Sequence, residues 1–177
     1  MSSRDTSDPQ AIELRHHLKP GDIGWVLQCH GHYYFENHGF GLEFESIVSR
    51  ILTDFATDHD EVRERLWIAE EPSGRRLGSV MLIHEPREDG KASQPWSRLR
   101  LFYVDPETQG RGIGNLLIRA CLDFSRACGY GGVVLDTVRQ LSAARYLYVR
   151  EGFELVKTYS HNEWGPQVDE EVWRLTF

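Results

Sequence analysis

The chain has 177 residues, 40% hydrophobic and 27% charged, and a net charge of −7. Its length fits one domain, and a chain of this size buries about 70% of the surface exposed on unfolding, so its core needs no disulfides. The negative charge argues against broad nucleic-acid binding, which requires a basic surface. The sequence has neither an apolar run of about 18 residues, as a membrane span requires, nor the features of a signal peptide in Met1–Gln10. We therefore expect a soluble, cytoplasmic domain over residues 11–177, after a flexible tail over residues 1–10.

The first half of the chain predicts strands on either side of one clear helix. Trp25-Val26-Leu27 predicts the start of a strand, which His30-Gly31-His32 interrupts before an aromatic patch at Tyr33-Tyr34-Phe35. From Leu42 to Phe55, apolar residues recur at steps of three and four, which predicts an amphipathic helix. Leu66–Ala69 and Leu77–Ile83 predict a hairpin joined by a turn at Pro72-Ser73-Gly74. Arg87–Pro95 is expected to be a polar loop.

Helices and strands alternate more regularly in the second half, which favours a layered α/β domain. The expected elements, in chain order, are a strand over Leu99–Val104, a helix over Ile113–Ala127 ended by Gly129, a strand over Val133–Leu135, a helix over Ser142–Glu151 closed by Gly152, and strands over Phe153–Thr158 and Val172–Phe177. The three cysteines include no CxxC pair. Cys121 and Cys128 lie seven residues apart, as small core residues on one helix face would.

A glycine-rich loop lies between the Leu99–Val104 strand and the Ile113–Ala127 helix. The first N–H groups of a helix lack partners within it, and the helix dipole places positive potential there. Glycines at 110, 112 and 114 would let phosphate oxygens approach these groups. Arg111 either adds a flanking positive charge or is solvated. The arrangement predicts a phosphate-binding site.

Other readings of these features fit less well. A Walker loop needs GK[ST], which the sequence lacks. A dinucleotide fingerprint would use Gly110 and Gly112, with Asp136 as its acidic residue, but Asn115 stands where the third glycine is needed. His30, His32 and His38 could suggest a metal site, yet no cysteine pair or HExxH motif accompanies them. We expect no metal.

Two motifs together resemble the GNAT superfamily of N-acetyltransferases. They are Gln109-x-x-Gly112-x-Gly114 and Leu147-Tyr148-x-x-x-Gly152-Phe153. The resemblance implies an α/β fold with a single mixed, mostly antiparallel sheet of about six to seven strands and about four helices. A bulge would splay the strands at 99–104 and 133–137. A closer likeness, suggested by Pro20–Trp25 and His32-Tyr33-Tyr34, is to the acetyltransferase half of MarR–GNAT fusions, here without the winged helix.

The resemblance also assigns the binding of acetyl-CoA and the general acid. The cofactor would be held by the strand residues Phe102, Tyr103 and Val104 and by the loop residues Gln109, Gly110, Arg111, Gly112, Ile113, Gly114 and Asn115. A backbone N–H of the Phe102–Val104 strand would stabilise the oxyanion. Tyr148 would protonate the departing thiolate, because a phenol with a pKa near 10 is protonated at neutral pH.

The acceptor would be the amine of a small molecule or amino acid, in a pocket near Tyr33, Tyr34, Glu36, Thr137, His161 and Trp164. Candidates for the general base are Glu36, His84 and His161. The sequence departs from the family where Arg98 and Arg100 replace a common strand glutamate, and where Leu141 replaces a common Asn. These departures leave a non-catalytic acyl-CoA sensor as an alternative, and a nucleotide-binding oxidoreductase as a weaker one. Oligomeric state is open, a homodimer being the commonest alternative.

Overall fold

The computed structural model describes residues 11–85 and 94–177, which form one seven-stranded mixed sheet, four α-helices and a 3₁₀ turn. The strand order is β1-β2-β3-β4-β5-β7-β6. The elements are β1 (Glu13–Arg15), α1 (Asp22–His38), α2 (Leu42–Asp58), β2 (Arg65–Glu70), β3 (Arg76–Glu85), β4 (Trp96–Val104), η1 (Pro106–Thr108), α3 (Ile113–Ala127), β5 (Gly132–Val138), α4 (Ser142–Arg150), β6 (Glu154–His161) and β7 (Val168–Thr176). The expected fold class is confirmed.

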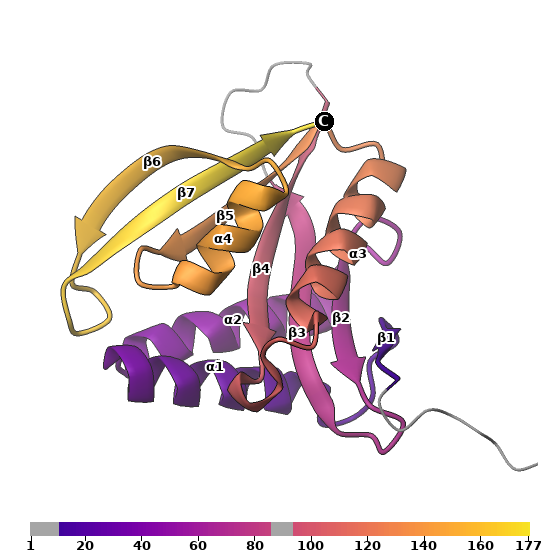
Figure 1. Ribbon diagram of the computed structural model, residues 1–177, viewed down its shortest axis with the longest axis horizontal. Helices are drawn as coiled ribbons and strands as arrows, with labels where there is room; N and C mark the ends of the chain where they lie inside the picture. The colour runs from indigo at the N-terminus through magenta and orange to yellow at the C-terminus, as the bar shows by residue number, and fades with distance from the viewer. Residues whose placement is uncertain (1–10, 86–93) are drawn as a thin grey trace, which may run out of the picture.

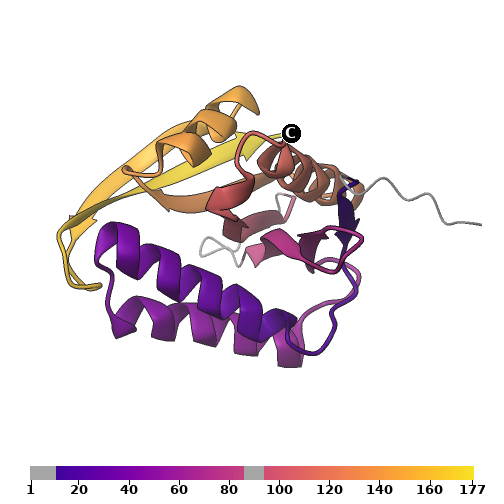
Figure 2. The same ribbon diagram turned by 60° about the horizontal axis from the view of Figure 1, so that its bottom comes forward.

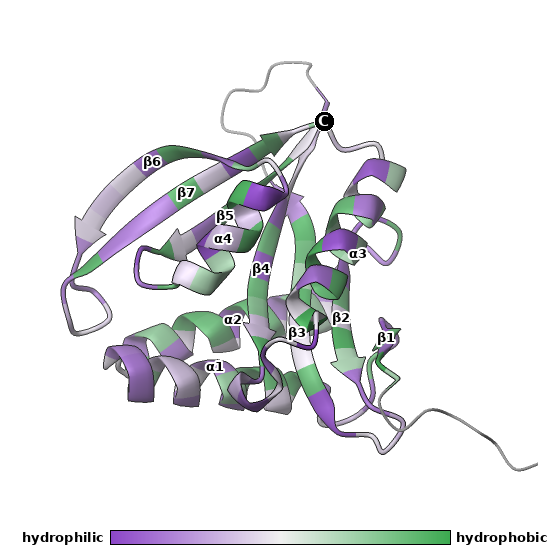
Figure 3. Ribbon diagram, viewed as in Figure 1, coloured by the Kyte–Doolittle hydropathy of each residue, from purple (hydrophilic) through white to green (hydrophobic). Residues whose placement is uncertain are grey.

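The helices cover the sheet on both faces. Helices α1 and α2 lie side by side on one face, and α3 and α4 lie on the other (Figures 1 and 2). Each face has its own core: Leu117, Ile118 and Cys121 of α3 pack on one, while Val26 of α1 and Leu52 of α2 pack on the other. The hydrophobic colour is concentrated on β2 and β3 and is sparser on β6 (Figure 3), whose residues are mostly exposed.

The sheet splits between β4 and β5. All neighbouring strands pair antiparallel except these two, which are parallel and pair only from Ser97↔Val133 to Leu99↔Leu135. Beyond Leu99, β4 continues beside β3, whereas β5 diverges with β7 (Figure 1). The register of β3 and β4 shifts between the pairs Met81↔Arg100 and Ser79↔Tyr103. This bulge coincides with the split, as the expected splaying requires.

The region expected to begin a strand at Trp25 is instead helix α1, so that prediction is wrong. The helix starts after Gly21 and ends at Gly39, both of which have positive φ. In its first turn, Asp22 accepts hydrogen bonds from the Lys19 N–H at 2.6 Å and from Arg15 at 2.7 Å. Aromatic and β-branched residues favour strands locally, but packing of the helix against α2 and the sheet overrides that weak preference.

The remaining elements agree with the sequence, with shifted ends. The three other helices and the β2–β3 hairpin form as expected, and Gly129 follows α3 in a left-handed conformation. Strand β7 begins at Val168 instead of 172, and β6 runs on to His161. Strand β1 was not expected from the sequence. The tail at residues 1–10 and most of the polar loop at 87–95 lie outside the described residues.

Candidate active site

The glycine loop ends in a helix start with free backbone donors. Asp105 caps η1 by accepting the N–H of Glu107 at 3.0 Å, and Gly112 is the N-cap of α3. The first bond into the helix runs from the Leu116 N–H to the Gly112 carbonyl at 3.0 Å. Within the described part of the chain, the N–H groups of residues 112–115 have no hydrogen-bond acceptor. Four free donors at the positive end of a 15-residue helix are the kind of feature that favours a negatively charged group.

The three glycines act in two ways. Gly110 and Gly112 have φ of 83° and 80°, and a Cβ at either position would meet only open space, so backbone conformation explains both. Gly114 instead allows close packing, because a Cβ there would lie 2.9 Å from Leu147 Cδ1 and 3.5 Å from Phe102 Cζ. Gly114 therefore sets how closely α3 approaches α4 and β4.

The side chains around this loop are held by local pairs. Arg111 donates to Glu71 at 2.7 Å, so its charge is partly neutralised by the β2–β3 connection and is not simply solvated. Arg150 of α4 hydrogen-bonds the side-chain oxygen of Asn115, which connects α3 to α4. The side chain of Ile113 is buried in the core, and Gln109 is exposed beside the loop.

Tyr148 lies on α4 with its ring in the core. It is 3% exposed, and its ring centroid lies 6.2 Å from that of Phe102 and 5.8 Å from that of Phe153. Burial, with smaller contributions from nearby Tyr34 and Cys121, raises the pKa of Tyr148 far above the ordinary value of a phenol. The phenol is therefore protonated throughout the physiological range.

Helix α4 is fastened to the sheet by a buried carboxylate. Glu171 of β7 is fully buried and accepts from Arg145 Nε at 2.8 Å and from Trp173 Nε1 at 3.0 Å. Together with the Arg150–Asn115 bond, this contact fixes the helix that bears Tyr148.

The bulge between β3 and β4 has one strained residue. Leu101 has φ of 49°, a left-handed conformation that is costly for a residue with a branched side chain. Its carbonyl accepts a hydrogen bond from Ser79 Oγ at 3.0 Å. The bulge directs Phe102 toward Tyr148 on one face, while Tyr103 contacts Trp25, His30 and Tyr33 of α1 on the other. Val104 packs against the same core as Phe102.

The aromatic residues expected in the acceptor pocket form one cluster. Tyr34 stacks on Phe40 at 5.4 Å and on His30 at 6.2 Å, and Trp164 packs against Phe40 at 5.0 Å. The Trp164 carbonyl accepts the Gly41 N–H at 2.8 Å, so the β6–β7 connection is fixed to the α1–α2 connection. Tyr33 joins the cluster edge-on to Tyr34 at 5.4 Å.

The other expected pocket residues are dispersed. Glu36 is exposed and lies 3.2 Å from His32 on the outer side of α1. His84 is exposed near the far end of β3, beside Tyr130. Thr137 is buried on β5, opposite Glu171 in register.

His161 lies at the end of β6, and both of its ring nitrogens are engaged. Its Nε2 donates to Glu170 Oε2 at 3.0 Å, and its Nδ1 accepts the Glu163 N–H at 3.3 Å. Burial and the adjacent Glu170 carboxylate raise the pKa of Tyr159 to about 12. The sequence analysis missed Glu170 because the last strand was expected to begin only at Val172. Alternation in Val168-x-Glu170-x-Val172 was the available signal.

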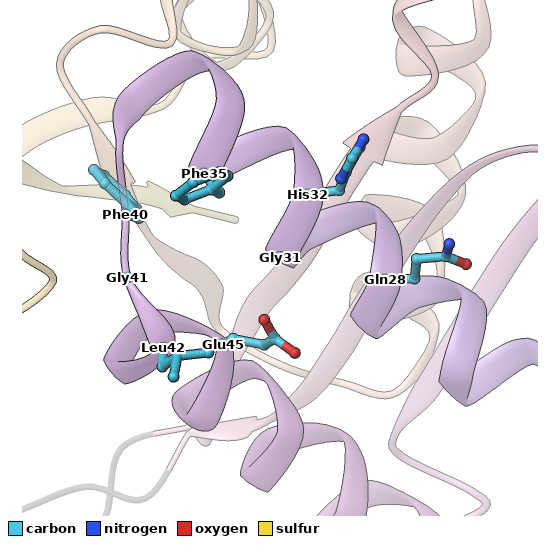
Figure 4. A pocket seen from close by; sticks show the side chains of 8 residues that line it. All are labelled: Gln28, Gly31, His32, Phe35, Phe40, Gly41, Leu42 and Glu45. Carbon is cyan, nitrogen blue, oxygen red and sulfur yellow. The ribbon is translucent and has the colours of Figure 1, made fainter.

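The groove between α1 and α2 contains no expected site residue. Its volume is about 380 Å³, and it faces away from the sheet, since Val26 and His30 of α1 are buried on the opposite side (Figure 4). The same helical geometry separates His30, which is buried, from His32, which is exposed.

Within residues 11–85 and 94–177, no group of three or more His, Cys, Asp or Glu side chains could hold a metal ion.

Comparison with known proteins identifies the class. The family described as "Acetyltransferase (GNAT) domain" matches residues 62–155, more than half of the chain. The chain belongs to this family of N-acetyltransferases, for which acetyl-CoA is the typical acetyl donor. No helix among the described residues has the length and apolar character needed to cross a membrane.

Individual relatives and structures agree with the family. The chain is 27% identical over 129 residues to an uncharacterized N-acetyltransferase of Schizosaccharomyces pombe, covering 73% of this chain and 75% of that protein. It is 35% identical over 105 residues to human N-acetyltransferase 8B, covering 58% of this chain and 44% of that protein, so the match spans less than half of the human protein's length. A putative acetyltransferase of Salmonella typhimurium, solved with acetyl-CoA, superposes with a TM-score of 0.71 at 17% identity, over 94% of each chain.

Proposed function

We propose that the protein transfers the acetyl group of acetyl-CoA directly to the amine of a small molecule or amino acid, with both substrates bound together. The observation that supports this most strongly is the set of four free N–H groups at the start of α3, next to the split between β4 and β5. The residues proposed to hold the donor are the backbone of Phe102–Val104 and the loop Gln109–Asn115. Acetyl-CoA supplies the activated acetyl group as a thioester.

Tyr148 is proposed as the general acid. Burial keeps its phenol protonated, and Phe102, whose backbone would line the acetyl arm, contacts its ring. Tyr148 therefore retains the proton that a departing thiolate requires. A backbone N–H at the bulge is proposed to stabilise the oxyanion, because a strained, fixed bulge orients its donors before the reaction. The likeness to the MarR–GNAT fusions, which rests on residues 20–25 and 32–34, stays a prediction from sequence.

Two measurements test the proposal. Acetyl-CoA at 100 times its Kd should stabilise the fold by about 2.7 kcal/mol, which raises Tm by roughly 5–10 °C for a protein of this size. NAD at the same concentration should leave Tm unchanged. Release of free thiol over a panel of amines then separates an enzyme from an acyl-CoA sensor, which would bind the donor without turnover.

A pair of glycine substitutions localises the donor site. Gly112 and Gly129 lie at opposite ends of α3, both with positive φ and open space around them. Gly112→Ala and Gly129→Ala should each cost about 1 kcal/mol of stability through backbone strain. Only Gly112→Ala should weaken acetyl-CoA binding, by tenfold or more. Equal affinities in the two variants would refute the placement of the diphosphate at this helix start.

A further inference from the structure

Arg100 is a partly buried cation that forms no ion pair among the described residues. It lies on β4 immediately before the bulge, and its side chain points to the α1–α2 face, since Ser97 and Leu99 face α3. Its Nε is buried without a hydrogen-bond partner, and no carboxylate lies within 4.0 Å of the guanidinium among the described residues. Burial, followed by repulsion from Arg98, lowers the pKa of Arg100.

Arg98, two residues earlier on the same face, forms the ion pairs that Arg100 lacks. It pairs with Glu85 at 2.7 Å and with Asp136 of β5. Arg98 is neutralised within the fold, whereas Arg100, with its Nε buried and unpartnered, is not, and removing a charged group from water without a partner is costly. An anionic group of a ligand would supply the partner that Arg100 lacks, and a carboxylate matches a guanidinium in geometry.

An opposite charge faces the same region from the other side of the split. Glu170 of β7 is largely buried and points away from α4, because its neighbour Glu171 contacts Arg145 of that helix. The charges of Glu85 and, to a smaller extent, Glu170 raise the pKa of Arg100, yet neither carboxylate forms an ion pair with it. His161 donates to one Glu170 oxygen and so orients the carboxylate.

We propose that the acceptor is an amine that also bears a carboxylate, as amino acids do. Its carboxylate pairs with Arg100, and its ammonium group meets Glu170. This inference deepens the proposed acetyl transfer and rests on it. Arg100 and Glu170 carry opposite charges, lie on strands that diverge and do not contact each other. A ligand that carries both complementary charges would pair with both of them.

The pairing also assigns the first proton transfer. The ammonium group loses one proton to Glu170, and the neutral nitrogen then attacks the thioester carbonyl to form the C–N bond and a tetrahedral oxyanion. When the oxyanion collapses the C–S bond breaks, Tyr148 gives its proton to the departing sulfur, and the nitrogen returns its second proton to the Tyr148 phenolate, so that the net proton released is the one on Glu170, which passes to solvent. Glu170 is thus proposed as the base, in place of Glu36, His84 and His161.

The test compares L-amino acids with the matching L-amino-acid amides, which keep the amine and lack the carboxylate. In the thiol-release assay, wild-type kcat/KM for the best amino acid should exceed that for its amide by roughly 10- to 100-fold, as expected for a charge-assisted pair. Arg100→Met should reduce that ratio to within about threefold. Arg98→Met should keep the ratio, while lowering Tm because it leaves Glu85 and Asp136 unpaired.

A binding measurement and a stability measurement separate the possible failures. Calorimetric titration of the same amino acids and amides into the protein with bound CoA needs no turnover. Carboxylate-dependent binding that Arg100→Met abolishes, without any thiol release, would uphold the acceptor subsite and refute the acetyl transfer. Turnover or binding that is equal for acids and amides, or no binding of either, would overturn the inference. Arg100→Met should have an unchanged or higher Tm, whereas a clear fall would show that Arg100 is structural.

Discussion

Acidification should weaken the fold through one buried imidazole, His30. Its side chain is 3% exposed and stacks against Tyr34. Its Nδ1 donates to the Val26 carbonyl at 2.8 Å, and its Nε2 has no partner among the described residues. Burial lowers the pKa of His30 to about 4, from 6.5 for an exposed imidazole. The folded protein therefore holds His30 neutral at pH values where the unfolded chain binds a proton.

The sign and size of the effect follow from that difference. The unfolded state binds more protons between pH 6.5 and 4, so stability falls as the pH is lowered through this range. A pH of 5 lies about 1.5 units below the pKa of the imidazole in the unfolded chain, so that imidazole is protonated, while His30 in the folded protein is still mostly neutral. At 1.36 kcal/mol per unit, the loss relative to pH 7 is about 2 kcal/mol, and it levels off near 3 kcal/mol below pH 4.

Urea unfolding at pH 7 and pH 5 measures this loss. The variant His30→Phe keeps a ring of similar shape and removes the titration, so its loss between the two pH values should be about 2 kcal/mol smaller than that of the wild type. His38, whose pKa is also lowered by burial, is present in both proteins and cancels. His32→Gln, at an exposed position of the same helix, is the matched control and should change stability by less than about 0.5 kcal/mol. An identical loss in wild type and His30→Phe would refute the reasoning.

Two further substitutions test the catalytic side of the split. Tyr148→Phe should lower kcat by at least tenfold while leaving acetyl-CoA affinity nearly unchanged, since general acid catalysis contributes about 10²–10⁴; wild-type turnover would remove the proposed role. Gly114→Ala should change the free energy of unfolding by less than about 1 kcal/mol, because the favourable helix propensity of Ala offsets the displacement of Leu147. Its kcat should still fall several-fold, because Leu147 adjoins Tyr148, whereas Gly24→Ala, with open space around it in α1, should stabilise the fold by roughly 0.5–1 kcal/mol without loss of kcat.

The elements near the donor site were predictable because their signals are local. The period of apolar residues over 113–127 defines α3, and a helix start exposes its own N–H groups whatever surrounds it. Gly110 and Gly112 have the backbone freedom that their φ angles require. Only the reason for Gly114 changed, because contact with Leu147 of another helix cannot be inferred from the loop alone.

The region around α1 was mispredicted as a strand because packing, not the local preference of its residues, decides its secondary structure. Residues such as Trp25 and Val26 favour strands by composition, and the aromatic run that follows does the same. In the folded chain the buried face of α1 packs on α2 and the sheet. The energy of that burial exceeds the few tenths of a kcal/mol per residue by which intrinsic propensities differ.

The sequence alone therefore determined the family resemblance, the glycine-flanked start of α3 with its free N–H groups, and the position of Tyr148 on its helix, all of which depend on residues close together in the chain. Only the tertiary structure placed Arg100 and Glu170, 70 residues apart in sequence, on the same face of the sheet and across the split between β4 and β5 from each other. The physical reason is that a charge's partner is chosen in space. Whether a partly buried arginine is neutralised by carboxylates, like Arg98, or is not, like Arg100, depends on strand pairing and side-chain alternation across the whole sheet.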